Sequence, residues 1–145
     1  MTLITCYSMT GEVASRGGFY DDLEGDGAAT CADWARSGEQ VSGSAGKVLP
    51  APDPSAAGLA VNGQDLAFTF YIGPYTGPAS YPSTDLEELA SLGDTDWANV
   101  NATDFTAQVS ADGSGSLSAS LTNDAGNGET ETITETWICV TEPAD

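Results

Sequence analysis

The sequence contains no histidine, and Arg16, Arg36 and Lys47 are its only basic residues. Without histidine, Ser-His-Asp and Cys-His catalytic arrangements and most catalytic zinc sites are excluded. No glycine-rich loop precedes a lysine, so the usual phosphate-binding loop is absent as well. No apolar run approaches the roughly 20 residues of a membrane-spanning helix, and no transmembrane segment is expected. These absences predict a protein that is not an enzyme.

Charge of one sign dominates the chain. It carries 22 acidic and three basic residues, a formal net charge of −19, and no basic residue follows Lys47. The acids cannot all be paired in salt bridges, so most of them must be solvated. Such a chain repels the phosphates of nucleic acids and anionic lipids, so nucleic acid is not an expected partner. The composition favours an extracellular or cell-surface location.

The clearest structural pattern lies in residues 104–140. Apolar residues alternate there with serine, threonine and glutamine, which is the period of a half-buried strand. Asp112-Gly113 interrupts the alternation once, and Asn123-Asp124, followed by two further glycines, interrupts it again; both are typical hairpin turns. The stretch predicts three antiparallel strands. Glu135 falls on the apolar side of the third strand, which we interpret as a bulge or as the point where the strand leaves the sheet.

The whole chain of 145 residues is expected to form one domain. Turn signals recur along it, and Asn62-Gly63 marks another hairpin, within residues 59–72. We predict an antiparallel β-sandwich of about seven or eight strands. One or two short helices are predicted, at residues 28–37 and 85–92. The second prediction rests on the capping pattern of Thr84 and Glu87, with Gly93 as the stop.

The chain has three cysteines, Cys6, Cys31 and Cys139, without the Cys-x-x-Cys spacing of a zinc or redox site. In an extracellular protein one disulfide is expected. Cys139 closes the last core strand, and either Cys31 or Cys6 could be its partner. We predict Cys31, because it lies on a helix that must dock against the sheet, and we expect the remaining cysteine to be a free thiol in the core.

Residues 75–82, YTGPASYP, resemble the Tyr-Thr-Gly-Pro-Gly-Thr-Tyr segment of a group of small bacterial secreted lipoproteins. In that group a DGSG-type hairpin and a closing strand ending in Trp-x-Cys follow. Here Asp112-Gly113-Ser114-Gly115 and Trp137-Ile138-Cys139 stand in the same order, although Ala79 replaces a glycine and no lipobox is evident. The resemblance covers residues 59–140. It implies a cell-surface, lipoprotein-like β-sandwich and supplies no catalytic residues.

One acidic segment has the spacing of a calcium-binding loop. Asp22, Glu24, Asp26 and Asp33 occupy positions 1, 3, 5 and 12 of an EF-hand-type or dockerin-type loop, with Gly27 at position 6. Oxygen ligands at this spacing converge on one hard cation while the glycine makes the sharp turn. The alternative is an acidic start to the helix that follows. The sequence thus predicts a Ca²⁺ site with these four ligands.

The aromatic residues admit two interpretations. Trp and Tyr close the core of a domain of this size, but they also stack on sugar rings in many binding modules. Tyr75, Tyr81 and Trp97 fall in predicted loops and are our candidates for ligand contact. We therefore predict a non-enzymatic extracellular or cell-surface interaction domain that binds an unidentified protein or glycan. The alternative is a small carbohydrate-binding or hydrolytic module that uses loop aromatics and carboxylates.

Overall fold

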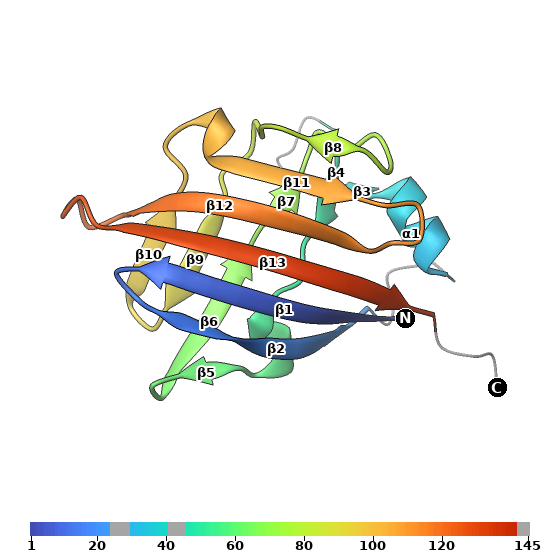
Figure 1. Cartoon of the computed structure of the whole chain (residues 1–145). Helices are drawn as coiled ribbons and strands as arrows, with labels where there is room; N and C mark the ends of the chain where they lie inside the picture. Colours follow the sequence, from blue (N-terminus) through green and yellow to red (C-terminus); the bar gives the residue numbers. More distant parts are fainter. Residues whose placement is uncertain (24–29, 41–45, 142–145) are drawn as a thin grey trace.

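The computed structural model describes residues 1–23, 30–40 and 46–141. Short elements make up the middle of the chain, and long strands make up its two ends (Figure 1). In chain order the first elements are β1 (Thr2–Gly11), β2 (Ser15–Asp22), α1 (Cys31–Ser37), β3 (Glu39–Gln40), β4 (Lys47–Pro50), η1 (Pro54–Ala57), β5 (Ala60–Val61) and β6 (Gln64–Thr69). They are followed by β7 (Tyr71–Ile72), β8 (Ser80–Tyr81), β9 (Leu89–Leu92), β10 (Thr95–Ala98), η2 (Ala102–Asp104), β11 (Phe105–Val109), β12 (Gly115–Asn123) and β13 (Thr130–Val140).

The described residues form an antiparallel sheet of ten strands and a smaller sheet of three. The large sheet runs in the order β2-β1-β13-β12-β10-β9-β6-β5, and β11 and β8 extend it from β12. In Figure 1 the long strands β12, β13 and β1 lie in front of β10, β9 and β6, so the sheet curls around its own core. The fold is mainly β and of the sandwich type, as predicted, with more strands than expected because several have only two residues.

Three predicted hairpins are present. β11 pairs with β12 and β12 with β13, with the two turns at the predicted positions. β5 and β6 form the hairpin around Asn62 and Gly63, whose φ angles of 53° and 78° lie in the left-handed region. The prediction of a bulge or exit at Glu135 is wrong. Glu135 pairs in continuous register with Leu117 on one side and with Tyr7 on the other.

The predicted helix at residues 85–92 is also wrong. Leu89–Leu92 form strand β9, which pairs with β6 and with β10. The Thr84 hydroxyl accepts the N–H of Leu86, which is the bond of a turn and not of a helix cap. Ala90 and Leu92 are buried at alternate positions, so burial in the sheet outweighs the local capping pattern. Of the other predicted helix, Cys31–Ser37 is observed, and residues 28 and 29 lie outside the described residues.

The core lies between the two layers and closes at one end under α1. Phe68 and Phe70 stack with ring centroids 5.1 Å apart, and Phe70 in turn contacts Phe105. Trp34 of α1 is also buried. The disulfide joins Cys31 to Cys139 across 108 residues, as predicted, and holds α1 against the end of β13.

Candidate functional site: an uncharged groove and face

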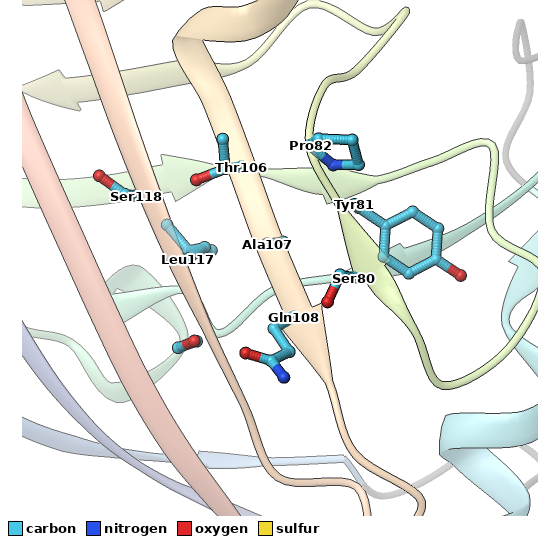
Figure 2. Close-up of a pocket in the computed structure, with 9 residues that line it drawn as sticks. Ser80, Tyr81, Pro82, Thr106, Ala107, Gln108, Leu117 and Ser118 are labelled. Carbon is cyan, nitrogen blue, oxygen red and sulfur yellow. The ribbon is translucent and has the colours of Figure 1, made fainter.

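An open groove lies where β8, β11 and β12 run side by side (Figure 2). Its volume is about 400 Å³. It is lined by Ser80, Tyr81, Pro82, Thr106, Ala107, Gln108, Ser116, Leu117 and Ser118. In Figure 1 no helix packs over the outer face of β11. The groove is therefore open to a partner from outside.

Strand register decides which side chains reach the groove. Gln108 pairs with Ser80 of β8 and with Ser116 of β12, and Thr106 pairs with Ser118. Residues paired in this way point to the same face of a sheet. Figure 2 shows the Gln108 amide beside the Ser80 hydroxyl, with the Thr106 and Ser118 hydroxyls farther along. The groove thus presents one amide and several hydroxyls that can donate and accept hydrogen bonds.

None of these nine lining residues carries a charge. The same holds for the outer face of the neighbouring strands, which we call the uncharged face. Its members are the outward residues of β1, β13 and β12, namely Thr2, Ile4, Cys6, Ser8, Thr10, Thr130, Thr132, Thr134, Thr136, Ile138, Val140, Ser116, Ser118, Ser120 and Thr122. In a chain with a net charge of −19, this surface has no formal charge.

Three glutamate side chains are buried on the inner side of the curled sheet, away from the uncharged face. Glu88, Glu131 and Glu135 have exposed fractions of 0%, 0% and 1%. Neither carboxyl oxygen of Glu135 has a hydrogen-bond partner among the described residues, and one oxygen of Glu131 also lacks one. A buried carboxylate without partners is strongly disfavoured, so burial favours the neutral form of these side chains in the folded protein.

The local environments explain how far each group is perturbed. Burial raises the pKa of Glu135 well above its usual value, and the nearby Asp53 and Asp21 raise it further. Burial raises the pKa of Glu88 to about 8, although its carboxyl accepts hydrogen bonds from the Tyr71 N–H and the Thr84 hydroxyl. Burial likewise raises the pKa of Glu131, against the N–H of Val13, which donates to it.

The groove and the buried carboxyls are separate from each other, and this limits the available chemistry. Tyr81 is the only titratable residue that lines the groove. Its hydroxyl donates to the Gly77 carbonyl and accepts the N–H of Thr76. Glu131 and Glu135 point into the core from β13 and are shielded from solvent. The groove can therefore hold a ligand through hydrogen bonds and packing, and its own residues offer no carboxylate pair for acid–base catalysis.

The aromatic residues predicted to contact a ligand have different positions. Trp97 is wholly buried in β10, not in a loop, and its indole N–H donates to Glu12. Tyr75 is 5% exposed, and its hydroxyl donates to the carbonyl of Ala35. Of the three, Tyr81 alone lines the groove, and its ring is directed away from Gln108 in Figure 2 and stacks on Tyr75 with centroids 5.5 Å apart. Tyr75 and Trp97 are thus core residues, and among the described residues neither of them presents a ring to the surface.

The predicted calcium ligands are only partly described. Asp22 ends β2 and is exposed, and Asp33 in the first turn of α1 forms an ion pair with Arg36. Glu24 and Asp26 lie outside the described residues. Among the residues that are described, no three acidic or cysteine side chains gather in a way that could hold a metal ion. The calcium loop therefore stays a prediction.

The cysteine that remains free is Cys6. It was expected in the core, but it is exposed on the uncharged face, where β1 pairs it with Thr136 of β13. The alternation within β1 explains the error, because Leu3, Thr5 and Tyr7 are the residues that point inward.

Sequence reasoning did not single out Gln108, Thr106 or Ser80 as groove residues. The polar residues that alternate with apolar ones in β11 and β12 were the available signal. On their own they indicate only a solvent-facing side, and the groove becomes evident when β8 pairs with β11. Within the described residues, no helix is long and apolar enough to cross a membrane. Comparison of the chain with protein-family models, with curated proteins and with solved structures finds no match in any of the three.

Proposed function

We propose that the protein is a non-enzymatic interaction domain of the extracellular space or the cell surface. The observation that carries the proposal is the uncharged groove between β8, β11 and β12 on a chain of net charge −19. A ligand seated there meets hydroxyl and amide groups and avoids the acids. The extracellular assignment is supported by the disulfide between Cys31 and Cys139, since disulfides persist in oxidising compartments.

A neutral carbohydrate is the ligand class that this chemistry favours. Sugar hydroxyls both donate and accept hydrogen bonds, as do the Gln108 amide and the Ser116 and Ser118 hydroxyls. An anionic glycan would be repelled by the net charge, and a cationic partner would gain more from the acidic surfaces elsewhere. Binding is proposed without hydrolysis, because Tyr81 is the only titratable group that lines the groove.

A glycan array, run in parallel with a screen for hydrolysis of the bound glycans, tests this function. We expect selective binding of neutral oligosaccharides without turnover. Gln108→Ala should weaken binding, because it removes the one amide of the groove. Ser120→Ala is the matched control, since Ser120 is exposed on β12 outside the groove. Hydrolysis, or glycan binding that Gln108→Ala leaves intact, would contradict the proposal. If a protein ligand binds instead and Gln108→Ala weakens that binding, the partner is a protein and not a glycan.

We also propose Ca²⁺ as a stabilising ion at Asp22, Glu24, Asp26 and Asp33, on the spacing of the acids alone. A specific site binds only the folded state, so the melting temperature should rise more in Ca²⁺ than in Mg²⁺ at equal ionic strength. Asp26→Ala should abolish the difference. An equal response to the two cations would reduce the segment to an acidic helix start.

A further inference from the structure

Most of the large apolar side chains that the fold leaves exposed gather in one place. Ile4, Tyr20, Ile138 and Val140 have exposed fractions of 37%, 67%, 55% and 41%. Ile4 of β1 pairs with Tyr20 of β2 on one side and with Ile138 of β13 on the other. Val140 follows two residues after Ile138 on the same face. The four residues form a continuous patch, which we call the apolar patch.

The charges around the apolar patch are few and of both signs. Arg16 and Asp22 point outward at opposite ends of β2, and they are the only charged residues on the outer side of β2, β1 and β13. Elsewhere the net charge of −19 makes two copies of the chain repel each other. The outer side of these three strands is therefore a place where two copies can meet without opposing acids.

We infer that the chain forms a two-fold homodimer through the outer side of β2, β1 and β13. A two-fold axis that crosses β2 near Phe19 reverses the strand, so Arg16 of one copy lies opposite Asp22 of the other, and the reverse. The same operation places Tyr20 opposite Gly18 of the second copy, a large ring over a residue without a side chain. The outer side of β2, β1 and β13 is thus complementary to itself in charge and in shape, which favours a second copy of the chain as its partner.

The expected interface is small. Three strands about 4.8 Å apart and some eight residues long, at about 3.3 Å per residue, cover roughly 400 Å². That is about half the area per partner of a standard stable interface, so the dimer should be weak and should form at high concentration. The sheet curls around its core, so the two convex surfaces touch over few strands. β8 and β11 lie on the far side of β12 from β1 and β2 (Figure 1), so the groove lies beside the expected interface.

Sedimentation equilibrium of the full chain, up to a protein concentration of about 1 mM, tests the inference. We expect reversible dimers that become stronger as salt screens the net charge. Ile138→Asp should weaken association by about tenfold or more, since it places a charge in the interface. Val100→Asp is the matched control, because Val100 is 71% exposed and lies before η2, away from the patch. A monomer under all these conditions, or equal effects of the two variants, overturns the inference.

A charge exchange tests the two-fold geometry itself. Arg16→Asp should weaken the dimer, and adding Asp22→Arg should restore it, because the two positions then again carry opposite charges. Cys6 supplies an independent readout within the same face, as the cysteine that is not in the disulfide. Its alkylation by a maleimide should slow as protein concentration rises, and in Ile138→Asp it should not. A rate independent of concentration in the wild type, or no restoration by the exchange, overturns the arrangement.

Discussion

The two faces of strand β13 carry polar residues in the reverse of the usual arrangement. Thr130, Thr132, Thr134 and Thr136 point outward, whereas Glu131 and Glu135 point inward beside Ile133 and Trp137. In most half-buried strands the charged residues take the solvent side. Here the strand places its acids where ionisation is most costly and keeps the solvent side neutral.

The contrast between the two faces of β13 distinguishes residues that folding favours from residues that a contact surface favours. An outward glutamate would be solvated and its charge would cost little, so self-repulsion is a weak reason for the row of threonines. The strand preference of their β-branched side chains favours them on folding grounds, and a contact surface would favour them as well. Burial favours the neutral form of an inward glutamate, and the neutral carboxyl is still a polar group that needs hydrogen bonds. The neutral outer face suits the proposed binding role, and the inner glutamates make stability depend on pH.

The largest expected effect comes from the disulfide that ends the inner side of β13. Replacing Cys31 and Cys139 together by alanine should lower the free energy of unfolding by about 4–5 kcal/mol, because the bond closes a loop of about 108 residues in the unfolded chain. Cys6→Ala, on the outer face, should change it by less than about 0.5 kcal/mol. Urea unfolding of both variants measures the contrast. Equal effects would mean that α1 is held by its packing and not by the bond.

The next largest effect comes from the tryptophan on the inner face. Trp137 is 3% exposed, and its indole N–H donates to the carbonyl of Gly113 at 3.0 Å. Trp137→Ala should cost about 3–5 kcal/mol through the lost burial and the cavity it leaves. Thr136→Ala, its outward neighbour, should cost no more than about 1 kcal/mol, through the lost strand preference of a β-branched side chain. Thermal unfolding compares the two, and a similar cost at both positions would contradict the assignment of faces.

Sequence alone predicted the alternation that defines these faces, because hydrophobic period and turn residues are local. It also predicted the disulfide, since Cys139 closes a core strand and Cys31 lies on a helix that must dock. Glu135 was misinterpreted because a glutamate on an apolar face suggests a break in the strand, and only the pairing with both neighbours shows otherwise. The β9 strand was missed because Thr84 and Glu87 form a helix-capping pattern, while its pairing partners come from distant parts of the chain. The groove depends on β8 lying beside β11, which no local pattern predicts.

The inner glutamates should make the protein less stable as pH rises. The folded-state pKa of Glu88 is about 8 and its usual value is 4.5, so between these values the folded state holds a proton that the unfolded chain has released. The stabilisation is complete below pH 4.5 and is lost as pH rises toward 8, by on the order of 1 kcal/mol per pH unit. Urea unfolding at several pH values measures the slope.

Matched variants assign this slope to the interior. The glutamine in Glu88→Gln cannot titrate. The variant should therefore reduce the slope of the free energy of unfolding against pH, between pH 5 and 8, by on the order of 1 kcal/mol per pH unit. Glu135→Gln should act in the same direction, because burial also raises the pKa of Glu135. Glu87→Gln, next to Glu88 but exposed, should leave the slope in place. A slope that Glu87→Gln reduces as much as Glu88→Gln would come from general charge repulsion and not from the buried groups.

The smallest expected effect decides why the outer face carries no acid. Thr134 lies one residue before Glu135 but points to solvent, so a glutamate there should remain ionised and hydrated. Thr134→Glu and Thr134→Gln both lose a β-branched side chain, a change of up to about 1 kcal/mol, so their difference isolates the charge. We expect that difference to be within about 0.5 kcal/mol in urea unfolding at pH 7, and smaller still in high salt. A charge penalty well above this value would mean that self-repulsion keeps acids off the face. Near-equality of the two variants would exclude self-repulsion and leave the strand preference of threonine, together with contact with a ligand or a second copy, as the reasons for its neutrality.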